Sequence, residues 1–103
     1  MDRHAYEVTV SLAAAGTAER FTAYMRDKHI PEIYATGCFV RIEFAALDAT
    51  TFRTTYIAGA RADVDAYLAT HQAAFKADFA AHFAPTDATA TRAVWHQLHT
   101  WGS

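Results

Sequence analysis

Hydrophobic and polar residues alternate near the start of the chain. Tyr6, Val8, Val10 and Leu12 are separated by Glu, Thr and Ser residues. A period of two places every second side chain on one face of a strand, so the pattern predicts a half-buried strand over residues 6–12. The turn-forming sequence DATT joins two of the remaining predicted strands as a hairpin. These remaining strands cover residues 38–47, 52–60 and 89–99.

A first helix is predicted after the opening strand, with Thr17 as its N-terminal cap. Pro31 has no N–H to donate, and its ring clashes with the carbonyl group four residues back. We therefore expect the helix to end or kink at residues 28–30 and a second short turn to follow over residues 31–35. Gly37 suits the left-handed conformation that closes such a turn.

A second, longer helix is predicted over residues 62–83 and ends before Pro85. Its hydrophobic and histidine positions recur at intervals of three and four residues, which is the spacing of one helical face. These positions are Val64, Leu68, His71, Phe75, Phe79 and His82 with Phe83.

The predicted elements follow the order strand, helix, strand, strand, helix, strand. This order is typical of an α+β, ferredoxin-like βαββαβ fold, with a four-stranded antiparallel sheet and two helices on one face. If the alternation holds in each strand, the open face carries Glu7, Thr9, Ser11, Phe39, Arg41, Glu43, Trp95 and Gln97. In a strand whose alternation is offset by one residue, the intervening residues lie on this face instead. A face that mixes Phe and Trp with charges is poorly suited to water, so we expect a homodimer that pairs the open faces, as in a dimeric α/β barrel.

Length and composition limit the classes of protein to which the chain can belong. Residues 1–103 are predicted to form one domain, since 52% of them are hydrophobic and only 19% are charged. The net charge is −2 with His neutral, and the nine basic residues are scattered. This distribution argues against nucleic acid and anionic membranes as partners.

Targeting and cofactor signals are missing from the sequence as well. No hydrophobic run approaches the roughly 20 residues of a membrane span, and the first ten residues lack the apolar core of a signal peptide. Cys38 is the single cysteine, so no disulfide forms within the chain. The four glycines include no phosphate-binding loop. We therefore expect a cytoplasmic protein without a cofactor.

The densest chemistry lies in the sequence HIPEIYATGCF, residues 29–39. His29 and Glu32 are three residues apart, a spacing that places two side chains on one side of a helix. An imidazole beside a carboxylate can act as an oriented general base or supply two metal ligands. The more common arrangement is structural, with His29 at a helix C-terminus and Glu32 in the first turn after Pro31, where the helix dipole favours each.

Other candidate groups lie further along the chain. His71 follows the hydrophobic positions of the long helix and can meet His29 if the helix ends converge, although a histidine there is more often a core residue. Cys38 is a candidate nucleophile only if its pKa is lowered, and a lone cysteine at a strand start is more often a small buried hydrophobe. Tyr34 and Tyr56 are candidate hydrogen-bond donors among aromatic residues that either line a pocket or fill the core.

Four parts of the chain carry a resemblance to a known family: YEVTVSL, YMRDKHIPEIYATGCF, the following hairpin and YLATHQAAFKADFAAHF. On these parts, nearly the whole chain resembles the bacterial family called domain of unknown function 4286. The resemblance implies a ferredoxin-like α+β fold of the dimeric barrel type and no established activity. The second helix is similar as well, with His71 in the matching place. The motif positions that match are His29, Ile30, Pro31, Glu32, Ala35, Thr36, Gly37 and Phe39.

Three functions are consistent with these features. The first is a homodimeric binding protein that holds a small apolar or aromatic ligand between the sheet and the helices. The second is a cofactor-independent enzyme with monooxygenase-like or cyclase-like chemistry, in which His29 or His71 is the general base. The third is a haem or metal site on one of these histidines. The candidate ligand contacts are Glu32, Tyr34, Thr36 and Tyr56.

Overall fold

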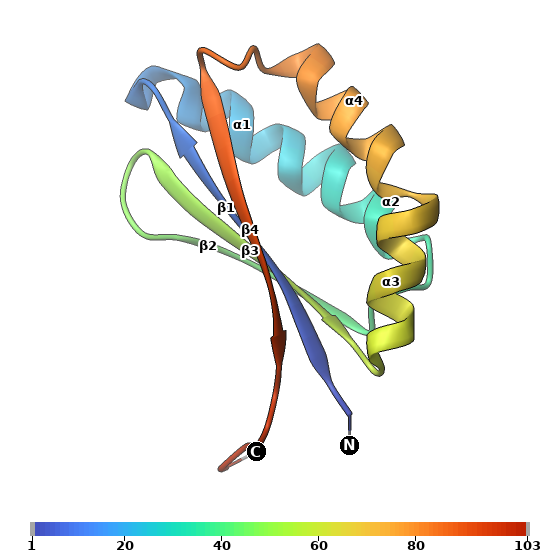
Figure 1. Ribbon diagram of the computed structural model, residues 1–103. Coiled ribbons are helices and arrows are strands. Elements are labelled where there is room, and N and C mark those ends of the chain that lie inside the picture. The colour runs from blue at the N-terminus through green and yellow to red at the C-terminus, as the bar shows by residue number, and fades with distance from the viewer. Residues whose placement is uncertain (1, 103) are drawn as a thin grey trace.

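Four strands form one antiparallel sheet in this computed structural model, which describes residues 2–102. The strands are β1 (His4–Leu12), β2 (Arg41–Ala46), β3 (Thr51–Ala58) and β4 (Ala88–His96). They lie side by side in the order β2-β3-β1-β4, and the helices cover one face of the sheet (Figure 1). This arrangement confirms the predicted α+β, ferredoxin-like fold class.

Two helical segments connect the strands. The segment between β1 and β2 contains a short 3-10 turn (Ala15–Thr17), α1 (Ala18–Tyr24), a π-helical turn (Met25–His29) and α2 (Ile30–Tyr34). The segment between β3 and β4 contains α3 (Arg61–Thr70) and α4 (Gln72–His82). None of the helices in residues 2–102 combines the length and the hydropathy needed to cross a membrane.

Of the two outcomes considered for Pro31, an end of the first helix or a kink in it, the first does not occur, because the helix continues to Tyr34. The turn before the proline widens, and the N–H of Ile30 bonds to the carbonyl of Met25, five residues back. Pro31 then lies in the first turn of α2, a position at which proline is well tolerated. The helix resumes at once, since the N–H of Ala35 bonds to the Pro31 carbonyl at 3.0 Å.

The long predicted helix is divided into α3 and α4 by a bend at His71. The φ angle of −115° at His71 is more extended than the helical value. Hydrogen bonding nevertheless continues through the bend, from the N–H of His71 to the Tyr67 carbonyl at 2.9 Å and from the N–H of Phe75 to the His71 carbonyl at 3.3 Å. The two helices therefore lie at an angle to each other over the twisted sheet (Figure 1).

The segment after α2 turns at Gly37, whose φ of +78° lies in the left-handed region that glycine adopts without strain. β2 begins at Arg41, later than predicted, so the strand alternation does not extend back to Phe39. Phe39 is 3% exposed and packs against Tyr56 and Tyr67 beneath the helices. Its predicted place on the open face of the sheet is therefore wrong.

Aromatic side chains fill the space between the sheet and the helices in two clusters. One surrounds Phe21 of α1, which is fully buried, with the rings of Phe52 and Phe83 at centroid distances of 5.0 and 5.6 Å. The other includes Tyr6 of β1 and Tyr56 of β3, with ring centroids 5.7 Å apart. Tilted and edge-on ring pairs of this kind add to the free energy that burial of the rings contributes.

The opposite face of the sheet is not covered by a helix (Figure 1). At its centre the strand register places Thr9 between Arg53 of β3 and Thr91 of β4, so this part of the face is polar. Trp95 lies near one end and is 57% exposed, whereas Gln97 follows the end of β4. The predicted open-face residues that the strand register places here are Glu7, Thr9, Ser11, Arg41, Glu43 and Trp95.

Candidate functional site

A cleft of about 230 Å³ opens between α4 and the helix-covered face of the sheet. The sheet side of the cleft includes Val8 and Val10 of β1, and the helix side includes Phe75 and Phe79 of α4. Met25, in the π-helical turn, also lines the cleft. A concave site with hydrophobic and aromatic walls is the usual form of a small-molecule site.

The π-helical turn brings Tyr24 and His29 together at this cleft. Residues five apart in an ordinary α-helix lie about 140° apart around the helix axis. The wider turn places the hydroxyl oxygen of Tyr24 3.2 Å from Nδ1 of His29, with the two ring centroids 5.3 Å apart. His29 also contacts the cleft wall, with its ring centroid 5.9 Å from that of Phe75.

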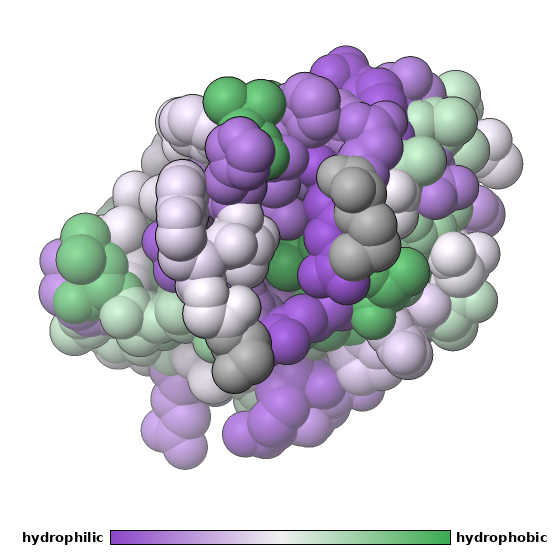
Figure 2. Space-filling view, turned by 90° about the horizontal axis from the view of Figure 1, so that it is seen from below, coloured by the Kyte–Doolittle hydropathy of each residue, from purple (hydrophilic) through white to green (hydrophobic). Residues whose placement is uncertain are grey.

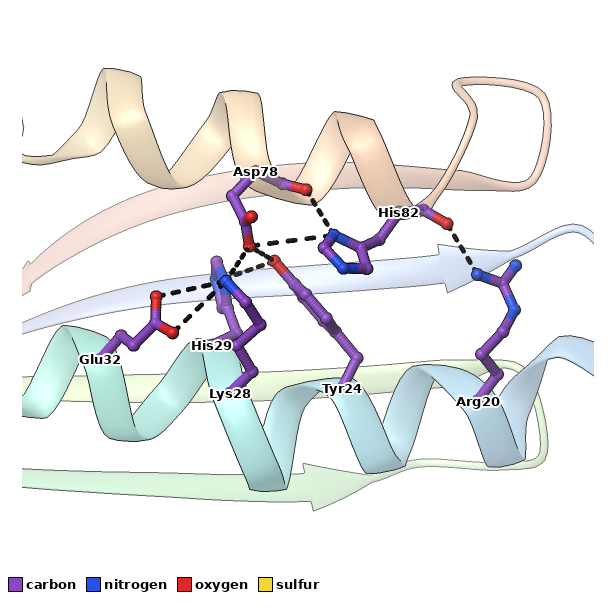
Figure 3. A network of polar contacts seen from close by, with 7 residues as sticks. All are labelled: Arg20, Tyr24, Lys28, His29, Glu32, Asp78 and His82. Atoms are coloured by element: carbon purple, nitrogen blue, oxygen red, sulfur yellow. Dashed lines mark hydrogen bonds and ion pairs between the residues drawn. The ribbon is translucent and has the colours of Figure 1, made fainter.

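Asp78 of α4 completes a hydrogen-bonded network with Tyr24 and His29 (Figure 3). The Tyr24 hydroxyl donates to Oδ2 of Asp78 at 2.6 Å, and Nζ of Lys28 donates to the same oxygen at 3.0 Å. These two donors lower the pKa of Asp78, which therefore carries a negative charge near neutral pH. Burial and the bond to Asp78 raise the pKa of Tyr24, so its phenol keeps its proton.

The network determines which nitrogen of His29 carries a proton. The single hydroxyl proton of Tyr24 is donated to Asp78, so the Tyr24 oxygen accepts the proton of Nδ1 of His29. Burial lowers the pKa of His29 to about 4, and the imidazole is therefore neutral at pH 7. A neutral imidazole has one N–H, which leaves Nε2 of His29 with a free lone pair that can accept a hydrogen bond.

Further polar groups lie along the same cleft. The side-chain amide of Gln72 donates to the Tyr6 hydroxyl at 2.9 Å. Lys76 of α4 and Arg92 of β4 line the cleft, and among residues 2–102 neither belongs to an ion pair. Burial raises the pKa of Tyr67, and the positive charge of Arg92 opposes that effect. The cleft therefore combines hydrophobic walls with two cations that have no acidic partner within residues 2–102.

The structure does not bring His71 to His29. His71 lies at the bend between α3 and α4 and does not line the cleft. Its ring centroid is 6.2 Å from that of Tyr67, which stacks on Phe75 at 6.2 Å. Two aromatic rings thus stand between the two histidines, and the convergence considered from the sequence does not occur.

The predicted ligand contacts divide into two groups. Tyr56 lines the cleft and is 2% exposed. Glu32 is exposed on α2 and pairs with Lys28, 3.3 Å away, and Tyr34 is 57% exposed. Thr36 donates its hydroxyl proton to the Ile33 carbonyl at 2.7 Å, which is a local turn contact. Glu32, Tyr34 and Thr36 do not line the cleft.

Sequence reasoning considered Tyr24 only as one of several aromatic residues that could line a pocket. It missed four other residues of the site: Gln72, Lys76, Asp78 and Arg92. One signal was available in the last strand. Arg92 has the same phase as Val94, so the period of two places this charge on the helix-covered face of the sheet. Asp78 gave no comparable signal, because its role depends on which face of α4 meets the first helix.

The metal-binding hypothesis gains no support at His29 or His71. In the part of the chain that the structure describes, one group of three side chains is close enough to share an ion, and neither histidine belongs to it. That group consists of Asp2, His4 and His96.

The sheet, its single helical layer and the cleft between them define a ferredoxin-like α+β protein. The chain belongs to the family described as Domain of unknown function (DUF4286), whose sequence profile matches residues 3–95. This match confirms the resemblance found in the sequence. No curated protein matches the chain.

Solved structures of distant proteins share the fold. A dimeric ferredoxin-like protein from an uncultured marine organism is 14% identical, covers 98% of this chain and 100% of its own, and has a TM-score of 0.78. SnoaB, a cofactor-independent oxygenase from Streptomyces nogalater, is 12% identical over 100% of both chains, with a TM-score of 0.72. A protein of unknown function from Nitrosomonas europaea is 14% identical over 100% of this chain and 98% of its own, with a TM-score of 0.67.

We predict that the imidazole of His29 titrates near pH 4, because burial opposes its charged form. The unfolded chain binds this proton near pH 6.5, so the free energy of unfolding falls as the pH drops from 6.5 towards 4. The expected loss is about 1–3 kcal/mol. Histidine NMR of the folded protein measures the titration, with the urea-unfolded chain as control. A folded-state midpoint near 6.5 would contradict the prediction.

Proposed function

We propose that this protein is a homodimer that binds a small aromatic ligand in the cleft between α4 and the sheet. The observation that carries the proposal is an aromatic-walled cleft lined by a neutral His29 and by two cations, Lys76 and Arg92, that form no ion pair in the part of the chain that the structure describes. Few, well-placed polar groups in a hydrophobic cavity are what orient a ligand in such sites.

The size and charge of the cleft narrow the ligand class. Its volume of about 230 Å³ lies below the range usual for drug-sized molecules, which favours one or two fused rings. Nε2 of His29 accepts a hydrogen bond from a hydroxyl group on the ligand. Lys76 and Arg92 are suited to an acidic substituent, because a carboxylate gains charge-assisted hydrogen bonds from either side chain.

Ligand binding is tested with 6-hydroxy-2-naphthoate, a two-ring probe that carries both groups, by isothermal titration calorimetry. Ala80 of α4 lines the cleft, whereas Ala77, on the same helix, does not. We expect Ala80→Phe to fill the cleft and weaken binding at least about tenfold, or 1.4 kcal/mol. Ala77→Phe is the matched control and retains the wild-type affinity. Equal affinities for wild type and Ala80→Phe would place the ligand elsewhere.

A second candidate function is cofactor-independent oxygenation, and the orientation of His29 supports it. Nε2 faces no competing partner in the Asp78–Tyr24–His29 network, so it can remove a proton from an enolisable substrate. The charge of Asp78 favours the imidazolium that results. Dioxygen then takes electrons from the substrate anion: a methylene becomes a carbonyl, and the second oxygen atom leaves as water with the two methylene hydrogens. SnoaB, which shares the fold, is a cofactor-independent oxygenase.

The oxygenation hypothesis predicts that 2-tetralone, a two-ring enolisable ketone, loses two hydrogens and gains one oxygen when incubated aerobically with the protein. Mass spectrometry and an oxygen electrode follow the reaction. We expect His29→Ala to abolish turnover and His71→Ala to retain it, since only His29 lines the cleft. Turnover that survives in both variants would refute a histidine base, and binding without turnover would leave the ligand-binding function alone.

Dimerisation through the open face is supported by the uncovered sheet and by the dimeric protein of the same fold. Thr9 lies at the centre of this face beside Arg53. We expect Thr9→Arg to place additional positive charge at the interface of both copies and to convert the dimer to a monomer. Ala77→Arg, on the helical side, is the control and stays dimeric.

Size-exclusion chromatography with light scattering at micromolar concentration measures the mass of each variant. A monomeric wild type, or a dimeric Thr9→Arg variant, would refute pairing through the open face.

A further inference from the structure

Three potential metal ligands meet where β1 begins and β4 ends, apart from the residues that line the cleft. His4 and His96 are directly opposite each other on these antiparallel strands, and their imidazole rings stack with centroids 4.5 Å apart. Oδ1 of Asp2 lies 2.9 Å from Nε2 of His96. One ligand atom from each of the three side chains falls within 4.8 Å of the others.

We propose that Asp2, His4 and His96 form a binding site for a divalent transition-metal ion of the Zn²⁺ type. Imidazole nitrogen and carboxylate oxygen are ligands that Zn²⁺, Ni²⁺ and Cu²⁺ share, whereas Mg²⁺ prefers oxygen ligands alone. Three protein ligands with water in the fourth position satisfy a tetrahedral ion.

The hydrogen bond of His4 supports this assignment. Nδ1 of His4 lies 3.2 Å from the backbone carbonyl of Asp2. Histidine ligands usually donate their second ring N–H to a carbonyl or carboxylate, which fixes the other nitrogen as the metal ligand. His4 is 7% exposed, so its ring is held in this orientation by the surrounding structure.

The backbone holds the ligand-bearing segments together. β1 and β4 are paired at His4 and His96, and beyond this pair the N–H of Gln97 bonds to the Arg3 carbonyl at 3.0 Å. Asp2 is therefore kept beside the end of β4. The view from this end of the sheet shows hydrophilic residues beside hydrophobic ones near the middle of the surface (Figure 2).

Metal binding requires only the exposed ligands to move. A bound ion lies close to the plane of each imidazole, whereas the two rings now stack with an interplanar angle of 4°. The side chains of His96 and Asp2 are 53% and 63% exposed, so they can rotate towards an ion held by the fixed His4. The ion would join the first strand to the last and stabilise the folded chain by mass action.

Calorimetric titration of the full chain with ZnCl₂ at pH 7.5 tests the site, with thermal unfolding as a second readout. We expect one ion per chain and a rise in Tm. His96→Ala and Asp2→Asn are each expected to weaken binding at least about tenfold. The control is His99→Ala, which removes an exposed histidine three residues further on and leaves the affinity unchanged. MgCl₂ is expected to give no saturable binding.

Several outcomes would overturn the site. They are the absence of saturable Zn²⁺ binding, unchanged affinity in both His96→Ala and Asp2→Asn, an equal loss in His99→Ala, and a stoichiometry of one ion per two chains. Circular dichroism shows whether each variant is folded. If His96→Ala does not fold, Asp2→Asn still tests the site.

Discussion

The site depends on one constraint, which is that the first helix has to continue past Pro31. A proline inside a regular α-helix removes one backbone hydrogen bond and clashes with the preceding turn. Here the turn Met25–His29 is widened, and the N–H of Ile30 reaches back five residues instead of four. The widening removes the conflict and brings Tyr24 to His29, side chains that an unbroken α-helix would separate. A backbone adjustment to proline thereby positions the polar side of the cleft.

The second determinant is a charge from another helix. Asp78 of α4 accepts hydrogen bonds from Tyr24 and from Lys28, so it stays ionised while Tyr24 keeps its proton. This bond directs the proton of His29 to Nδ1 and leaves Nε2 as an acceptor. Arg20 of α1 donates to the His82 carbonyl at 2.7 Å and holds the end of α4 against α1 (Figure 3). The protonation of His29 is therefore a property of the packed helices.

Much of the fold could be predicted because it follows from local patterns. The alternation in Tyr6, Val8 and Val10 identified β1, and the order of the elements identified the ferredoxin-like class. The errors arose where local rules compete. Pro31 was expected to end or kink the first helix, and the π-helical turn lets that helix continue. The delayed start of β2 moved Phe39 from the open face into the core. Of the candidate site residues, His29 and Tyr56 line the cleft, and Glu32, Tyr34 and Thr36 do not.

The sequence by itself determined the family, the fold class and the residue types available for chemistry, because periodicity and a family motif are properties of neighbouring positions. Only the tertiary structure decided that His29 works with Tyr24 and Asp78 rather than with His71. Residues 24 and 78 are distant in the chain, and their contact depends on the rotation of α4 about its own axis and on one widened turn. Neither quantity is encoded in a local pattern, since both result from packing the two helices on the same sheet.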